Sequence, residues 1–337
     1  MSERFNKGQI RWWTTLVWGV TGLALLLLFN AFFTPGFFTI TMRSGHLYGV
    51  LIDILNNGAK VMLLSLGMAL VIATRGVDLS VGAVMALAGA LAAKLINTGT
   101  VPFGWVIVAA LGVALVAGAW NGLLVGAFRI QPIVATLILM VAGRGVAMLI
   151  TDGQIITFTD PNLVFIGNGH LLGFPFPVWI SLGLLLLTIV ITRRTAIGLF
   201  IESAGDNQTA STYAGIDAAK VKFFVYVFSG LCAGLAGLVA SSNIKCADSN
   251  HAGLFLELDA ILAVVVGGTP LTGGRFYLVG AIIGALFIQT LTTTMYMRDV
   301  SPDVAPVPKA LAILAVCLLQ SPVARRRAAG LLKRRAA

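Results

Sequence analysis

Charged residues are scarce in this sequence. Only 11% of its 337 residues are Asp, Glu, Lys or Arg, whereas 58% are hydrophobic; a soluble domain carries about 25% charged residues. The mean hydropathy is +0.94, and apolar runs of the roughly 20 residues that cross a hydrocarbon core recur along the chain. The composition excludes an ordinary soluble domain and predicts an all-α polytopic membrane protein.

Residues that carry chemistry are equally few. The three cysteines form no CxxC pair, and the three histidines lie far apart in polar stretches. The chain contains no GxxxxGK[ST] loop of the kind that cradles nucleotide phosphates. No acid–base or nucleophile set can be assembled from its titratable residues. We therefore expect no catalytic residues, no metal site and no cofactor, so any energy for its function has to come from a partner.

Both ends of the chain are basic. Residues 1–11 lead into Trp12, Trp13 and an apolar run without a signal-peptide cleavage site, and residues 321–337 carry six of the 23 Lys and Arg residues. Because basic flanks stay in the cytoplasm, both termini are predicted to be cytoplasmic, on either side of a transmembrane domain over residues 12–320. The net charge of +10 is ascribed to this topology and to lipid headgroups, not to nucleic acid.

Hydropathy and the positions of Lys and Arg predict ten spans. The stretch 151–177 contains no Lys or Arg and is placed outside, whereas the loop 193–222 begins and ends with basic residues and is placed in the cytoplasm. The expected spans cover residues 12–33, 59–74, 80–96, 101–128, 133–150, 178–192, 223–242, 258–266, 278–293 and 307–319.

One carboxylate lies between two of these spans, in the stretch RGVDLSVG of residues 75–82. Asp78 or Ser80 can accept hydrogen bonds from the free N–H groups that open the span from residue 80, which is the commonest use of Asp and Ser there. The alternative is a broken helix at a transport gate. Both interpretations stay open, and both place Asp78 at or near the cytoplasmic face beside Arg75.

Three long stretches resemble one family. They are GVDLSVGAVMALAGA, WNGLLVGAFRIQPIVATLILMVAGRGVAMLITDG and ELDAILAVVVGGTPLTGGRFYLVGAIIGALF. In this order they are similar to the permease subunits of bacterial ABC importers for monosaccharides, of the ribose, xylose and galactofuranose type. The resemblance covers about residues 50–320 and is greatest to the galactofuranose permeases.

The resemblance implies a working assembly. Two permeases, identical or paralogous, would pass a sugar across the bacterial inner membrane. They would work with a pair of ABC ATPase subunits on the cytoplasmic side and a periplasmic sugar-binding protein outside. The permease itself would not be an enzyme. The resemblance also favours a fold of two inverted-repeat halves, a recurrent plan of transporters.

The loop 193–222 resembles the coupling loop of such permeases. Glu202, Ala204, Gly205 and Gly215 stand at the matching places. Small residues allow a short helix to enter a groove on an ATPase, and Glu202 would supply a charged anchor. The loop departs from the commoner alanine-rich version of the motif. The alternative is an ordinary solvated linker.

Several polar residues fall within or beside the apolar runs. A charge such as Arg144 costs about 2.5–3.5 kcal/mol at the centre of a span, so we expect it to line the sugar path, to extend outward to the membrane surface or to pair with an acid such as Asp152. Asn121 is expected to form an interhelical hydrogen bond or to line the path. Glu257 and Asp259 would contact sugar hydroxyls or the binding protein, or cap the helix that follows them.

Two other function classes are weighed against an ABC permease. A stand-alone secondary transporter of a small polar solute would usually need an ion-coupling group at midmembrane, whereas most acids here lie at span ends. A membrane enzyme would need a catalytic set. The GxxxG spacings at residues 118–122, 230–234 and 280–284 favour a compact helical bundle.

Overall fold

A computed structural model describes residues 2–43, 45–301, 304 and 306–320, so the basic tail at 321–337 lies outside the described residues. The described chain is all-α, with short two-stranded antiparallel pairs in its connections. The helices are α1 (Ser2–Phe33), α2 (Val50–Ala73), α3 (Val81–Thr98), α4 (Phe103–Gly122) with the π-helical turn η1 (Leu123–Ala127), α5 (Pro132–Ile150), α6 (Pro161–Asn168), α7 (Phe176–Arg194), α8 (Ile197–Asp206), α9 (Gln208–Tyr213), α10 (Ala218–Ile244), α11 (Leu256–Val266), α12 (Leu278–Tyr296) and α13 (Pro306–Gln320).

The strands pair within the connections and form no larger sheet in the described residues. Pairs form between β1 (Thr41–Arg43) and β2 (His46–Tyr48), between β3 (Ile156–Thr157) and β6 (Cys246–Ala247), and between β4 (His170–Leu171) and β5 (Phe174–Pro175).

Seven helices in the described part of the chain are long and apolar enough to cross a membrane. They are α2, α3, α4 continued by η1, α5, α7, α10 and α12. The prediction of an all-α polytopic membrane protein is confirmed. Helix α11 has 11 residues, or about 17 Å at 1.5 Å per residue, which is too short to cross a core about 30 Å thick. The count of ten spans and the inverted repeat stay predictions.

Helix α2 begins nine residues earlier than its apolar run indicates, at Val50 instead of Ala59. The first turns contain Asp53, Asn56 and Asn57, and such polar residues lower the hydropathy of a window without preventing a helix. Within this region the Asn57 side chain donates to the Asp53 carbonyl at 3.1 Å. Part of the connection between the first two expected spans, 12–33 and 59–74, is therefore helical.

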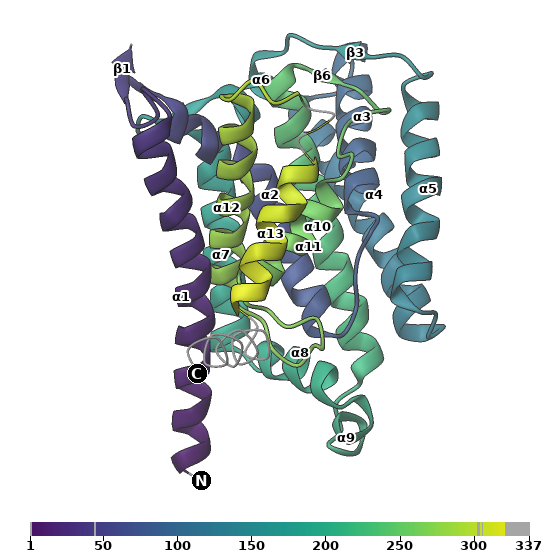
Figure 1. Ribbon diagram of the computed structural model, residues 1–337. Helices are drawn as coiled ribbons and strands as arrows, with labels where there is room; N and C mark the ends of the chain where they lie inside the picture. The colour runs from purple at the N-terminus through teal and green to yellow at the C-terminus, as the bar shows by residue number, and fades with distance from the viewer. Residues whose placement is uncertain (1, 44, 302–303, 305, 321–337) are drawn as a thin grey trace.

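The connections divide the molecule into two ends (Figure 1). Helices α8 and α9 and the start of α1 lie at one end, which we call the α8 end. The paired strands and α6 lie at the opposite end, which we call the strand end. Helix α1 stands at the edge of the bundle and packs against α12 and α13. Charged segments thus gather at two ends, with apolar helices between them.

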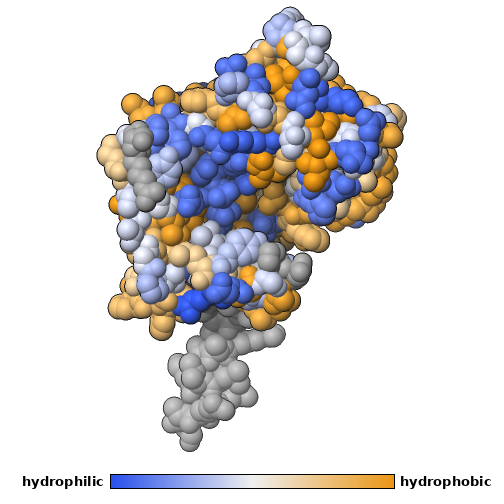
Figure 2. All heavy atoms as spheres, turned by 90° about the horizontal axis from the view of Figure 1, so that it is seen from above, coloured by the Kyte–Doolittle hydropathy of each residue, from blue (hydrophilic) through white to orange (hydrophobic). Residues whose placement is uncertain are grey.

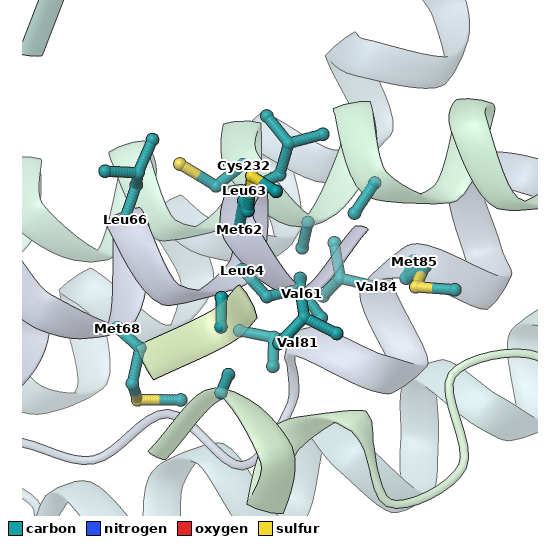
Figure 3. Close-up of a cluster of buried hydrophobic side chains, with 14 of the residues drawn as sticks. Val61, Met62, Leu63, Leu64, Leu66, Met68, Val81, Val84, Met85 and Cys232 are labelled. Carbon is teal, nitrogen blue, oxygen red and sulfur yellow. The ribbon is translucent and has the colours of Figure 1, made fainter. Parts of the chain in front are cut away.

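Helix α2 occupies the centre of the bundle, where it packs against α7, α10, α11 and α12. It is apolar on nearly all sides from Val61 onward and is buried along that length, as expected for a core helix. In helix α5, in contrast, only 22% of the apolar stretch is buried. Most of its large apolar side chains are exposed. Figure 3 shows part of the core, including Leu63, Leu64, Met68, Val81, Val84, Met85 and Cys232.

Glycines bring the backbones of α4 and α10 close together. A Cβ atom on Gly118 would lie 2.5 Å from the Tyr226 carbonyl oxygen, and one on Gly230 would lie 2.9 Å from the Gly118 Cα. The third GxxxG spacing packs Gly280 and Gly284 of α12 against α11. All three spacings therefore lie at helix contacts that no larger residue permits.

We expect Gly118→Val to destabilise the protein by about 1–3 kcal/mol or more, because the added side chain overpacks the α4–α10 contact. Gly112→Val is a matched control in the same helix, since a Cβ on Gly112 meets nothing within 4 Å. Thermal unfolding of the purified protein in detergent measures the difference. Equal melting temperatures for the two variants would contradict this packing.

Candidate functional site

The segment between α7 and α10 folds into two short capped helices at the α8 end. The Asn207 side chain accepts the Ala210 N–H at 3.0 Å and caps α9. Asp217 accepts the N–H groups of Ala219 and Lys220 and caps α10. Caps of this kind stabilise helix starts by about 1 kcal/mol each. The segment between α7 and α10 is therefore helical over much of its length, and its role as a coupling loop or as a solvated linker stays a prediction.

Arg75 joins this segment to two others. Its Nε donates to the Thr272 carbonyl at 2.9 Å, and its Nη2 donates to the Asp206 carbonyl at 2.5 Å. The Gly274 N–H donates to the Ala73 carbonyl at 2.8 Å. The end of α2, the end of α8 and the loop 267–277 between α11 and α12 therefore meet at one point. We call this contact the Arg75 junction.

The four residues matched to the coupling loop have different environments. Ala204 is 2% exposed, and Gly205 is buried in the Arg75 junction, where a Cβ would lie 2.7 Å from the Gly274 nitrogen. Gly215 is exposed and has a φ of +82°, a conformation that glycine adopts without strain. These three residues therefore shape the segment.

Glu202 faces the protein as much as the solvent. Its Oε1 lies 3.6 Å from Arg193 Nη1, and its side chain is 31% exposed. Burial raises the pKa of this carboxyl, while the charges of Arg193 and Arg275 oppose the rise. The Arg193 guanidinium also lies 5.0 Å from the centre of the Phe276 ring. Glu202 thus helps to hold α8 against the loop 267–277.

The sequence patterns did not single out the apolar residues that this segment exposes. Tyr213, at the end of α9, is 89% exposed, and Leu199 of α8 is 62% exposed. Helix α9 lies at the tip of the α8 end in Figure 1. Exposed aromatic rings on a polar tip are typical of protein contacts. Their positions within short polar helices carry no periodic signal in the sequence.

A buried polar cluster lies where α3 begins. Asp78 is 2% exposed, and its Oδ1 accepts hydrogen bonds from the Ser80 N–H at 3.0 Å and the Ser80 hydroxyl at 2.6 Å. Its Oδ2 accepts from the Ser229 hydroxyl of α10 at 2.7 Å. The Asn121 side chain of α4 donates to Ser80 Oγ at 2.8 Å and to Asp78 Oδ1 at 3.5 Å. We call these four residues the Asp78 cluster.

The cluster shows which side chain of the turn accepts a backbone N–H. Ser80 forms no side-chain capping bond, and Asp78 accepts the N–H of Ser80, which precedes the first residue of α3. Arg75 donates to carbonyls of the Arg75 junction, whereas the carboxylate of Asp78 accepts from Ser80 and Ser229. Asp78 is therefore a buried tie between the turn, α4 and α10, because those helices surround it on more than one side.

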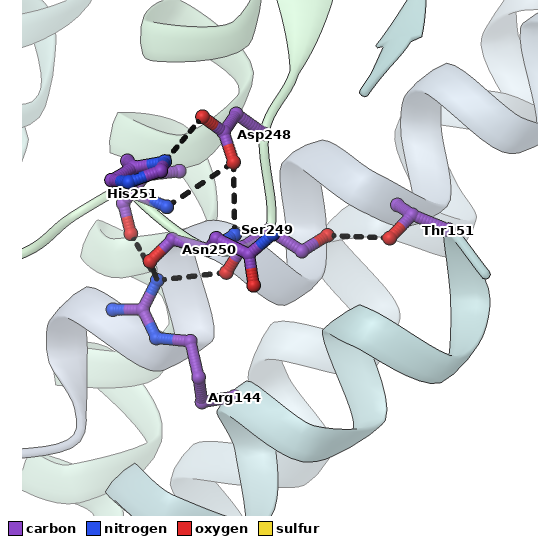
Figure 4. A network of polar contacts seen from close by, with 7 residues as sticks. Arg144, Thr151, Asp248, Ser249, Asn250 and His251 are labelled. Carbon is purple, nitrogen blue, oxygen red and sulfur yellow. Dashed lines mark hydrogen bonds and ion pairs between the residues drawn. The ribbon is translucent and has the colours of Figure 1, made fainter. Parts of the chain in front are cut away.

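Arg144 holds a loop at the strand end (Figure 4). Its Nη1 donates to the carbonyls of Ser249 at 3.0 Å and Ala252 at 2.5 Å, with a longer contact to Asn250 at 3.5 Å. The expected alternative of a pair with Asp152 is wrong, because Asp152 pairs with Lys94 at 2.8 Å. Carbonyl oxygens accept these hydrogen bonds, and the charges of Glu257 and Asp248 lie near enough to favour the charged guanidinium.

Glu257 and Asp259 lie two positions apart in the first turn of α11 and face different neighbours. Glu257 is 5% exposed and faces the start of α3, where a Cβ on Gly82 would lie 2.6 Å from its Oε2. Asp259 pairs with Lys309 of α13 at 2.9 Å, and both side chains are less than one-fifth exposed, at 13% and 17%. The two carboxylates therefore do not form a common site.

The candidate residues thus fall into separate groups. Asp78, Ser80 and Asn121 come together, whereas Arg144, Glu257 and Asp259 each have their own contacts. Within the described residues, no group of three His, Cys, Asp or Glu side chains is arranged to hold a metal ion.

Comparison with known proteins identifies the family. The model for branched-chain amino acid transport system / permease component matches residues 50–318. The chain belongs to this family of ABC permeases. Its membership explains the lack of a nucleotide loop, because the permease is not itself the ATPase. No solved structure matches the chain.

Three curated relatives match this permease over nearly its full length. The galactofuranose transporter permease protein YtfT of Escherichia coli is 49% identical, over 94% of this chain and 92% of the relative. The fructose import permease protein FruF of Bifidobacterium longum is 38% identical, over 96% and 92%. The ribose import permease protein RbsC of Haemophilus influenzae is 37% identical, over 88% and 90%.

Replacement of Asp78 tests the cluster. In Asp78→Ala the Ser80 N–H and the Ser229 hydroxyl lose their acceptor, and a buried unsatisfied donor costs about 1–3 kcal/mol. We expect the melting temperature of the permease in detergent to fall by about 5 °C or more. The melting temperature of Asp78→Asn should fall less, because the amide oxygen still accepts a hydrogen bond and the Ser229 hydroxyl can turn to accept one from the amide nitrogen. An equal fall in both variants would mean that the charge itself is required.

Proposed function

We propose that this chain is the transmembrane subunit through which a monosaccharide enters the cell by alternating access. The observation that carries the proposal is the 49% identity to a galactofuranose permease over 94% of the chain. Relatives named for ribose and fructose are more distant. Galactofuranose or a related pentose or hexose is therefore the first substrate to test. Family membership argues against the alternative of a stand-alone secondary transporter.

The proposed topology places the α8 end in the cytoplasm. Arg193 and Arg194 end α7, and Lys220 and Lys222 lie in the first turns of α10; such short basic segments are held inside. The strand end, which includes the stretch 151–177, then faces the periplasm. The proposed total of ten counts α1 and α13 as spans and the short α11, together with the segments that flank it, as one further pass between the strand end and the α8 end. Both termini then lie on the cytoplasmic side of the bacterial inner membrane.

In this orientation the segment α8–α9 docks on an ABC ATPase. The exposed Tyr213 and Leu199 supply apolar anchors, and interface hot spots are enriched in aromatic residues. Glu202 acts within the permease by pairing with Arg193. In this proposal Glu202 positions α8, and Tyr213 instead of Glu202 contacts the ATPase.

The Arg75 junction offers a path from the ATPase to the interior. A displacement of α8 acts on the end of α2 and on the loop 267–277, because Arg75 and Gly274 join all three. The chain then continues from Arg75 to Asp78, which is tied to α4 and α10. Packed helices and hydrogen bonds of this kind carry coupling between distant sites. A second permease and a periplasmic sugar-binding protein complete the proposed assembly.

Sugar uptake by the reconstituted assembly tests the proposed function. The permease is combined in proteoliposomes with its ATPase and binding protein, and entry of labelled galactofuranose, ribose and fructose is measured. We expect ATP-dependent uptake of at least one of them, and none when the phosphate-loop lysine of the ATPase is replaced. Absence of uptake of all three sugars would contradict the assignment.

Two variants separate docking from coupling. Tyr213→Ala should reduce copurification of the ATPase by about tenfold or more, since truncating an interface anchor costs about 2 kcal/mol. Thr212→Ala, at an exposed neighbour, is the matched control. Glu202→Arg should keep the ATPase bound but abolish uptake, because a cation there repels Arg193 and Arg275. Unchanged uptake in Glu202→Arg would remove the positioning role.

A further inference from the structure

Lys60 is a charged residue within the membrane-spanning helix α2. It lies ten positions after the first residue of α2, about 15 Å along the helix at 1.5 Å per residue. A lysine at the centre of a span costs about 2.5–3.5 kcal/mol. In the described part of the structure, no carboxylate pairs with Lys60 and no group accepts a hydrogen bond from it.

Two other lysines of the permease have carboxylate partners. Lys309, which is also largely buried, pairs with Asp259, and Lys94 pairs with Asp152 at 2.8 Å. Unpaired charges inside a membrane are usually functional and face a wet cavity. The missing partner of Lys60 therefore points to a ligand.

Lys60 lines a cavity of about 220 Å³ toward the strand end. The cavity lies between α2, α3 and α10 and is bounded by the segment 246–256. Its walls include Met85, Leu254 and Leu256, together with Gly89 and Gly237. Seen from this end, hydrophilic residues gather in a hollow between apolar flanks (Figure 2). We call this space the Lys60 cavity.

The polar groups of the cavity suit a neutral polyol. The Lys60 ammonium has three donors. Asp248 also lines the cavity and accepts from His251 Nδ1 at 2.8 Å (Figure 4). The presence of both charge signs disfavours an anion. The apolar walls match the C–H faces of a sugar, and the volume equals about seven water molecules at about 30 Å³ each, which limits the occupant to a small molecule.

We propose that the Lys60 cavity binds the transported monosaccharide within a single permease chain, with the Lys60 ammonium donating to sugar hydroxyl oxygens. The proposal rests on the proposed function and adds a binding residue to it. Arg144 shapes the site from behind, because it fixes the carbonyls of Ser249 and Ala252 in the bounding segment.

Lys60→Met tests the role of the ammonium. Methionine has a similar length and carries no charge. Removing an unpaired buried charge does not destabilise a protein as removing a structural partner does. We therefore expect an unchanged or higher melting temperature of the full complex, together with a fall in sugar uptake of about tenfold or more. Lys94→Met, which removes an exposed pair, is the control and should retain uptake.

The outcomes distinguish a failure of the proposed function from a failure of the cavity assignment. If the wild-type complex transports none of the sugars, the proposed function fails. If the wild type transports and Lys60→Met transports equally well, the cavity assignment fails alone. A lower melting temperature with proportionate loss of complex would assign Lys60 a structural role and overturn the proposal.

A native thiol provides a second test that does not depend on the stability of a lysine variant. Cys246 lines the Lys60 cavity and is partly exposed, whereas Cys232 is 1% exposed. In a Cys317→Ser background, a membrane-impermeant maleimide added from the periplasmic side reports on Cys246. We expect the sugar that the complex transports to slow this labelling, and to lose that effect in Lys60→Met. Equal labelling rates with and without sugar in a transporting complex would overturn the proposal.

Discussion

The close approach of helix backbones is the constraint on which the rest of this permease depends. Helix α10 reaches α4 at Gly118 and Gly230, and it reaches α2 at Gly67, where a Cβ would lie 2.9 Å from the Ser229 Cα. Lipid provides little hydrophobic force between helices, so such packing holds a membrane bundle together. Because α10 lies this close to α2 and α4, the Ser229 hydroxyl can reach Asp78.

The same close packing extends to the α8 end. Gly205 admits the end of α2 and Gly274 into one small space, and Arg75 then joins their backbones through carbonyl oxygens. Carbonyl acceptors allow a guanidinium to be satisfied where no carboxylate is present. Arg144 uses the same solution at the strand end. Two arginines thus hold loops at opposite ends of the bundle without a buried ion pair.

The buried polar residues divide by whether the protein satisfies them. Asp259 pairs with Lys309, and the carboxylate of Asp78 accepts from Ser80 and Ser229. Buried hydrogen-bond networks and ion pairs of this kind stabilise one arrangement of the helices. Lys60 has no partner among the described residues although it lies in a span. The distinction matters for function. A polar side chain with partners in the protein resists displacement, whereas one without a partner can still form hydrogen bonds to a ligand.

Local hydropathy determined much of this structure from the sequence. Each of the seven long apolar helices overlaps an apolar run that was predicted as a span, and three signatures indicated the family that residues 50–318 match. Only the tertiary structure decided the partners. Asp78 and Ser229 are 151 positions apart, and Arg144 binds carbonyls more than 100 positions away, not Asp152. Hydropathy carries no information about the rotation of each helix about its axis or about which helices pack together. The rotation and packing of the helices bring Asp78, Asn121 and Ser229 together and leave Lys60 facing a cavity.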